Sequence, residues 1–211
     1  MSNILKGIEI AKRFGKTEVL ASCSVEFQSG EVVGIIGENG SGKTVLLKIL
    51  CGLMKADRGA VSYNGEQLGK ELRFLPSVGV IIENPGFFDD LSGIENLEIL
   101  ASIQGVISTE EIKDSIKKVG LEINDKKVKN YSLGMRQRLG IAQAIMENPE
   151  VIILDEFTTA LDTDGIDMAH RIVLEMKRKG KIIIITSHSK YDVDNLCDRK
   201  YQIKGGVIYE I

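Results

Sequence analysis

Four short apolar runs recur along the chain, each rich in Val and Ile. Runs of this length that end at polar or turn residues are typical of buried strands. They lie at 31–36, 78–82, 151–154 and 181–185. The segment 3–28 instead alternates short apolar and polar runs and is punctuated by Gly15 and Gly30, which predicts a small antiparallel sheet.

Helical spacing of apolar residues replaces the strand pattern from Ser92 to Asn148 and returns over 166–179. The tail, 201–209, reads as a hairpin around two glycines. We therefore predict one domain, 1–211. Its α/β core and β subdomain are formed by 1–85 and 149–211, and its inserted α-helical subdomain by 86–148.

The composition narrows the class of protein further. The 211 residues carry a formal net charge of −3 and no long basic block, which argues against a broad cationic surface for nucleic acid. No apolar run reaches the 18 or so residues of a membrane span, and the first residues lack a signal-peptide core. Three scattered cysteines, Cys23, Cys51 and Cys197, predict reduced thiols in a cytosolic protein.

One stretch between the first buried strand and a helical pattern at 45–53 matches G-x-x-x-x-G-K-[ST]. It consists of Gly37, Glu38, Asn39, Gly40, Ser41, Gly42, Lys43 and Thr44. A glycine-rich turn at a helix N-terminus directs backbone N–H groups at an anion, so this loop predicts ATP binding. Lys43 would reach the β- and γ-phosphates and the Thr44 hydroxyl would ligand Mg²⁺. The fold class is accordingly an α/β P-loop NTPase (RecA-like) core with an N-terminal antiparallel β subdomain and an inserted α-helical subdomain.

Acidic and imidazole side chains follow three other predicted strands. Asp155 and Glu156 come directly after 151–154; Asp155 would hold Mg²⁺ or its water shell, and Glu156 would polarise an attacking water. His188 ends the strand that begins at Lys181. Glu83 ends 78–82, where a solvated loop residue and a ligand at the sheet edge are equally good interpretations. His170, within a predicted helix, is better explained as a packing or surface residue than as a ligand.

The string Tyr131-Ser132-Leu133-Gly134-Met135-Arg136-Gln137-Arg138-Leu139 resembles the signature sequence of the ATP-binding cassette (ABC) ATPases. With the motifs above, in the same order, nearly the whole chain resembles the nucleotide-binding domain of an ABC transporter. The strings around Glu83 and Ser132 are similar to the branch of bacitracin-export and lantibiotic-immunity ATPases. The chain departs from the usual pattern at Glu83, Leu133, Met135 and Phe157, where Gln, Gly, Gln and Pro are common.

The resemblance implies roles for further residues. Phe14 would stack on adenine, although a hairpin or core role is as good an interpretation, and Glu83 would sense the γ-phosphate near Mg²⁺. Ser132 and Gly134 would bind the ATP of a second subunit, although Ser132 alone is simply a helix N-cap. The loop 159–162, with Leu161 and Asp162, would face that subunit. His188 would act as a switch beside the catalytic Glu156. Phe87 and Phe88, which could equally be core, would dock on the permease.

On this basis we expect a Mg²⁺-dependent ATPase that drives a separate membrane permease through ATP-dependent dimer closure. The resemblance further implies an exporter of peptide antibiotics, on the cytoplasmic face of a bacterial cell membrane. The alternative is a non-transport ABC ATPase of translation or DNA repair. Such proteins usually carry a second cassette or a long insertion, and neither is visible in this sequence. A kinase or GTPase is disfavoured by the signature string and by the absence of Asn-Lys-x-Asp.

Overall fold

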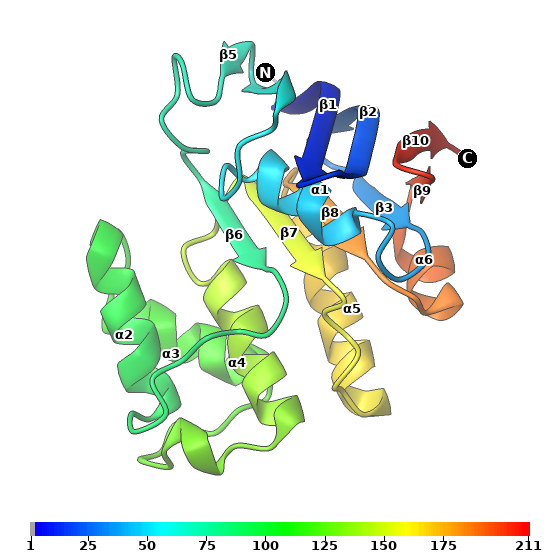
Figure 1. The fold of residues 1–211 in the computed structure, drawn as a ribbon. Helices are drawn as coiled ribbons and strands as arrows, with labels where there is room; N and C mark the ends of the chain where they lie inside the picture. The colour runs from blue at the N-terminus through cyan, green and yellow to red at the C-terminus, as the bar shows by residue number, and fades with distance from the viewer. Residues whose placement is uncertain (1–2) are drawn as a thin grey trace.

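The computed structural model describes residues 3–211, and its strands form one sheet (Figure 1). The ten strands lie in the order β5-β4-β1-β2-β10-β9-β3-β8-β7-β6. Their bounds are β1 Ile4–Phe14, β2 Thr17–Gln28, β3 Val32–Ile36, β4 Arg58–Tyr63, β5 Glu66–Gln67, β6 Val78–Ile81, β7 Val151–Asp155, β8 Ile182–Thr186, β9 Arg199–Lys204 and β10 Val207–Glu210.

Six α-helices and one 3₁₀ turn complete the part of the chain that the structure describes. They are α1 Lys43–Leu50, α2 Gly93–Gln104, α3 Thr109–Lys118, η1 Val128–Asn130, α4 Leu133–Ile145, α5 Thr163–Arg178 and α6 Lys190–Leu196. Within residues 3–211, no helix has both the length and the apolar character needed to cross a membrane.

The centre of the sheet is parallel, with β3, β8, β7 and β6 side by side. Successive side chains of a strand point to opposite faces, so each strand contributes to two separate cores. Ile183 and Ile185 of β8 pack with α4 and α5, whereas Ile182 and Ile184 pack with α1 and the first two strands. This two-sided burial explains why the four runs are nearly continuously apolar rather than alternating.

The antiparallel strands β5, β4, β1 and β2 form one side of the sheet and cover α1 (Figure 1). Although β2 and β3 are consecutive in sequence, the β9–β10 hairpin lies between them in the sheet. β10 joins β2 through the pair Val207 and Ser22, and the N–H of Ala21 donates to the carbonyl of Gly206 at 2.8 Å.

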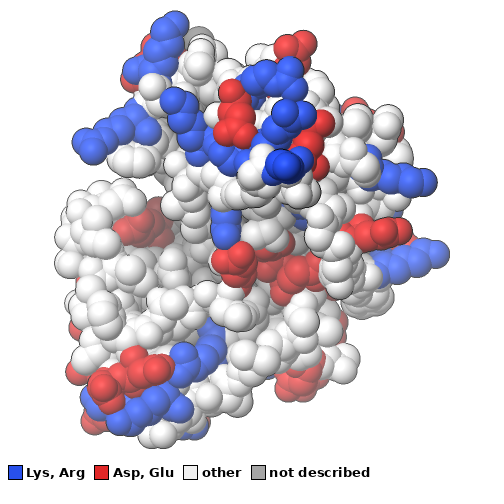
Figure 2. Space-filling view, viewed as in Figure 1, with Lys and Arg blue, Asp and Glu red and all other residues white. Residues whose placement is uncertain are grey.

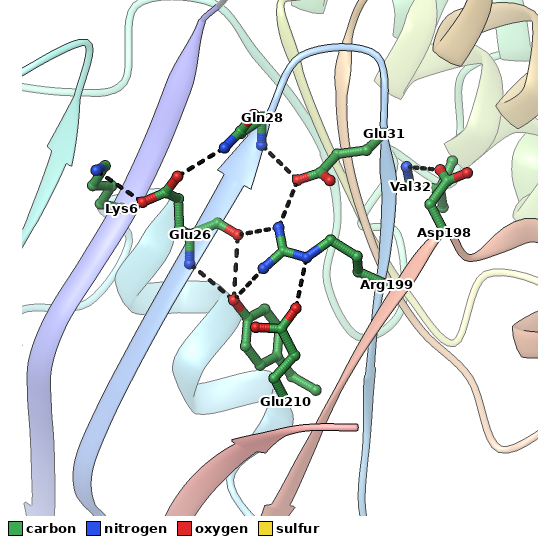
Figure 3. Close-up of polar contacts among 9 residues, drawn as sticks. Lys6, Glu26, Gln28, Glu31, Val32, Asp198, Arg199 and Glu210 are labelled. Atoms are coloured by element: carbon green, nitrogen blue, oxygen red, sulfur yellow. Dashed lines mark hydrogen bonds and ion pairs between the residues drawn. The ribbon is translucent and has the colours of Figure 1, made fainter.

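Arg199 cross-links these strands through its guanidinium (Figure 3). It donates to the carboxylates of Glu31 at 3.0 Å and Glu210 at 2.7 Å. It also donates to the Tyr201 hydroxyl at 2.9 Å and the Glu26 carbonyl at 3.3 Å. One side chain therefore joins β2, the turn before β3, β9 and β10.

The helical segment between β6 and β7 begins each of its first two helices with a capping box. The Ser92 side chain accepts from the backbone of Glu95, whose carboxylate accepts in return from Ser92, and Ser108 and Glu111 repeat the arrangement. The predicted fold class, an α/β core with N-terminal antiparallel strands and a helical insertion, is confirmed.

Two helices differ from the sequence prediction. Helix α5 begins at Thr163 rather than at Ile166, because the Asp162 side chain accepts from the Gly165 N–H at 3.0 Å and caps an additional turn. Helix α6, seven residues long, was not predicted, since its buried residues are only Asp192, Val193 and Leu196 and give little helical pattern.

Candidate functional site

The loop between β3 and α1 is shaped by glycines where other residues would clash. Gly42 precedes α1 with φ of 102°, and a Cβ there would lie 2.9 Å from Leu20 Cδ2. A Cβ on Gly37 would lie 2.7 Å from both the Ile203 carbonyl and Ser41 Oγ. The loop is thus held against β2 and β9, and α1 starts directly from it at Lys43.

The Lys43 side chain curls back over this loop. Its ammonium donates to the carbonyls of Gly37 at 2.7 Å and Glu38 at 3.1 Å, and the residue is only 7% exposed. Among residues 3–211 its hydrogen bonds go to these backbone carbonyls and none goes to a carboxylate, and Ser41 Oγ is buried without a hydrogen bond. A buried cation and a buried hydroxyl with unused bonding capacity fit an anionic ligand.

An open cavity of about 400 Å³ lies beside the loop. Its walls are 17–19 at the start of β2, 37–41 of the loop and 202–206 of the β9–β10 hairpin. Two distant segments of the chain, 17–19 and 202–206, therefore flank the predicted phosphate loop. Phe14 is absent from this lining. It ends β1, is 48% exposed, and has the Lys12 ammonium 5.7 Å from its ring centroid.

Thr44 and Asp155 meet at the carboxyl end of the parallel strands. Thr44 Oγ1 donates to Asp155 Oδ2 at 2.8 Å, and Thr186 Oγ1 donates to Oδ1 at 2.5 Å. Sequence reasoning missed Thr186, whose only signal is a hydroxyl directly after four isoleucines. The described residues contain no group of three or more His, Cys, Asp or Glu that could hold a metal alone. A hydroxyl and one carboxylate instead fit a hard cation that shares its other ligands with phosphate and water.

Glu156 follows β7 in a left-handed backbone conformation, with φ of 48°. Its N–H lies 3.0 Å from Thr186 Oγ1 and 3.2 Å from the Thr186 carbonyl. Its carboxylate accepts from the His188 N–H at 3.3 Å, and His188 Nε2 lies 3.2 Å from Oε1. Non-glycine residues rarely adopt this conformation, which costs free energy and is concentrated at functional sites. The strands β7 and β8 thus bring Glu156 and His188 together.

Glu83 also has a left-handed backbone, with φ of 60°. Its carboxylate pairs with the Lys48 ammonium at 2.9 Å and is 63% exposed. The structure therefore places Glu83 against α1, and this ion pair was not foreseen from the sequence. The ion pair with Lys48 does not connect Glu83 to the side chains of Thr44 and Asp155.

The signature segment lies at the start of α4, in the lower part of the molecule and away from α1 (Figure 1). Ser132 Oγ accepts from the Met135 N–H at 3.1 Å, which confirms the N-cap. A Cβ on Gly134 would lie 3.0 Å from the Ala160 carbonyl, so the helix start approaches the loop 159–162 closely. Arg138 of α4 donates to Asp162 at 3.0 Å and connects the same two segments.

The two adjacent phenylalanines separate into different environments. Phe87 is half-buried and packs against the core of the helical segment, whereas Phe88 is 63% exposed. Three more large apolar side chains near α2 are exposed, namely Ile99, Ile103 and Val106. Figure 2 shows that much of the surface around α2 is uncharged, while acidic side chains gather at the centre of the same face. Of the two predicted docking residues, the structure exposes mainly Phe88.

The chain is similar to known ABC transporter proteins. The family model described as "ABC transporter" matches residues 20–159. An uncharacterised ABC transporter ATP-binding protein of Bacillus subtilis, YybJ, is 44% identical over 96% of this chain and 94% of its own length. The bacitracin transport ATP-binding protein BcrA of Bacillus licheniformis is 36% identical over 100% of this chain and 70% of its own length. The lantibiotic transport ATP-binding protein SrtF of Streptococcus pyogenes is 37% identical over 92% and 84%.

A solved structure has the same fold. The dimeric bacterial ABC transporter cassette MJ0796 superposes with a TM-score of 0.88 at 23% sequence identity, over 98% of this chain and 97% of its own. The phosphate loop 37–44, the strand end at Asp155 and the signature segment 131–139 all lie within residues 20–159, which the family model matches. This chain belongs to the ABC transporter family, as an ATP-binding subunit.

Proposed function

We propose that the chain binds ATP with Mg²⁺ at the carboxyl ends of β3, β7 and β8 and hydrolyses it. The observation that carries this proposal is the convergence of Thr44 with Asp155 beside Lys43. Lys43 would exchange its two loop carbonyls for phosphate oxygens, and Ser41 Oγ would find a partner there. The loop 37–42 would surround the phosphates with backbone N–H groups.

Thr44 and Asp155 would hold Mg²⁺, which supplies charge neutralisation on the phosphate oxygens. Thr186 fixes the Asp155 carboxylate by its hydrogen bond to Oδ1. Glu156 would orient a water molecule and accept its proton, and His188 would hold the Glu156 carboxylate in place. Glu83, at the same edge, would act in response to the γ-phosphate if it leaves Lys48.

We further propose that two subunits enclose the nucleotides between them. Ser132 and Gly134 lie at a helix start away from Lys43 of the same chain, so they are available to a second copy's ATP. Leu161 and Asp162, next to that helix start, would contact the partner. The dimeric cassette MJ0796 supports a paired arrangement for this fold.

The subunit would drive a separate membrane permease from the cytoplasmic face of a bacterial membrane. Phe88 and the exposed apolar residues of α2 offer a docking surface, and much of the surface around α2 is uncharged in the view of Figure 2. The similarity to BcrA and SrtF supports an exporter of peptide antibiotics. The cargo itself would contact the permease rather than this chain.

Size-exclusion chromatography of Glu156→Gln with and without Mg·ATP tests the proposal. The variant should bind ATP, turn over little, and shift from monomer to dimer, because the bound nucleotide then persists. Lys43→Ala is the control and should remain monomeric, because it binds ATP weakly. Normal turnover by Glu156→Gln would contradict the role of this carboxylate.

A further inference from the structure

Asp192 is a carboxylate buried within α6, at 1% exposure, outside the site described above. Burial of an ionised group costs free energy unless hydrogen bonds replace water. Burial raises the pKa of Asp192, but hydrogen bonds from His170, Ser187 and Thr158 outweigh it and leave the pKa below its ordinary value. The fold therefore keeps a charged carboxylate here with every donor in place.

One oxygen of Asp192 receives two hydroxyl donors. Thr158 Oγ1 and Ser187 Oγ both donate to Oδ2 at 2.6 Å, and both residues are buried. Thr158 lies two residues after Glu156, and Ser187 directly precedes His188. A single buried atom thus joins the two loops that carry the proposed catalytic pair.

The second oxygen ties the same carboxylate to α5. His170 Nε2 lies 2.8 Å from Asp192 Oδ1. The residue is buried, and its imidazole stacks on Tyr191 with ring centroids 5.5 Å apart. The sequence favoured a packing role for His170 over a metal ligand, and the structure gives it this specific partner. Ser189 also caps α6 by accepting from the Asp192 N–H at 3.3 Å.

We propose that Asp192 is a positioning residue that sets the relative placement of Glu156 and His188 through the hydroxyls of Thr158 and Ser187. This inference rests on the proposed hydrolysis by Glu156. Glu156 holds a strained backbone, so a contact close by must offset the tendency of this loop to relax. Because Thr158 and Ser187 share one acceptor, a movement of one loop is transmitted to the other.

The matched pair Thr158→Val and Thr158→Ser separates the hydroxyl from the packing. Valine keeps the shape of threonine without its hydroxyl, and serine keeps the hydroxyl without the methyl group. We expect Thr158→Val to lower kcat about tenfold or more with KM for Mg·ATP nearly unchanged, since small misplacements of catalytic groups cost large factors in rate. Thr158→Ser should stay close to wild type.

Ser187→Ala should reproduce the loss in kcat, and the double variant Thr158→Val/Ser187→Ala should lose less than the product of the two single effects. Asp194→Asn is the control in the same helix. Asp194 is exposed and pairs with Lys200 at 2.9 Å, so its change should leave kcat unaltered. A Thr158→Val enzyme with wild-type kcat, or a Thr158→Ser enzyme equally impaired, would overturn the proposal.

Hydrogen–deuterium exchange of the nucleotide-free protein supplies a measurement that does not depend on turnover. Thr158→Val should accelerate exchange in 187–189 as well as in its own loop, and Asp194→Asn should do neither. Acceleration confined to the mutated loop would refute the coupling even if the rate fell. A wild-type protein without ATPase activity would contradict the proposed function, whereas the exchange pattern would still decide the coupling.

Discussion

The Thr44 hydroxyl donates to the Asp155 carboxylate at 2.8 Å, although 111 residues separate them in the chain. Asp155 ends β7 and Thr44 lies in the first turn of α1. The contact therefore joins the helix that follows the phosphate loop to the strand that ends in the acidic pair. Thr186 holds the other carboxylate oxygen. The proposed magnesium ligands are thus oriented by hydrogen bonds within the protein.

Asp155→Asn should weaken the binding of ATP in the presence of Mg²⁺ by about 10- to 100-fold, the range typical of lost partners around a metal. Without Mg²⁺ the variant should bind ATP almost as wild type, because Lys43 and the loop 37–42 are unchanged. Isothermal titration with Mg²⁺ and then with EDTA measures both. An equal loss under the two conditions would show that Asp155 acts on folding rather than on the metal.

Phe88→Asp should abolish transport by the assembled transporter while leaving the ATPase activity of the isolated subunit unchanged. The reason is that Phe88 is largely exposed and its backbone is hydrogen-bonded to Asn96 of α2, a helix that also exposes Ile99 and Ile103. Phe87→Asp is the comparison: this residue packs on the core, so the change should lower the melting temperature. Transport by Phe88→Asp at the wild-type rate would exclude this surface as the docking site.

Replacing Arg199 by Lys should lower the free energy of unfolding by about 1–3 kcal/mol, the typical value of hydrogen bonds to charged groups. Lysine keeps the charge but cannot reach Glu31, Glu210 and Tyr201 together, as the guanidinium does in Figure 3. Urea denaturation measures the change. Glu210→Gln, which removes the charge of one exposed partner, should lower the free energy of unfolding less than Arg199→Lys does. Equal losses in the two variants would contradict a central role for Arg199.

Burial raises the pKa of the Cys23 thiol to about 11 and that of Cys197 to about 12. The thiolate is the reactive form, so at pH 8 iodoacetamide should modify both slowly in the folded protein and rapidly in urea.

The raised pKa of these two thiols should also make the free energy of unfolding depend on pH. Above the unfolded thiol pKa of about 8.5, the unfolded state loses these protons first, so the free energy of unfolding should fall as pH rises toward 11. Unchanged stability across that window would contradict the assigned burial.

Motifs that lie in continuous sequence were predictable, and contacts made by the topology were not. The loop 37–44, the strand ending at Asp155 and the Ser132 cap each follow from neighbouring residues. Thr186 and Asp192 gain their roles only because β7, β8 and α6 meet in space, and no local pattern marks them. The left-handed backbone of Glu156 is equally invisible in the sequence, because the surrounding fold imposes it.

The side-chain environments of the adjacent aromatic residues could not be predicted from the sequence either. Phe87 and Phe88 are adjacent and identical in chemistry, so only the packing of the helical segment distinguishes the half-buried ring from the exposed one. The partner of Glu83 was likewise unpredictable. Lys48 reaches it from α1 because the phosphate-loop helix and the end of β6 lie side by side.

The position of β9 and β10 between β2 and β3 has a consequence for synthesis of the protein. Ribosomes deliver the strands in sequence order, so β1 to β8 emerge before the hairpin that completes the sheet between β2 and β3. Until 199–210 leave the exit tunnel, the nascent chain must carry two sheet fragments with open edges, which are prone to aggregation. The cavity beside 37–41 also lacks its wall from 202–206 during that interval. The proposed nucleotide site is therefore complete only after translation has passed the last turn of the sheet.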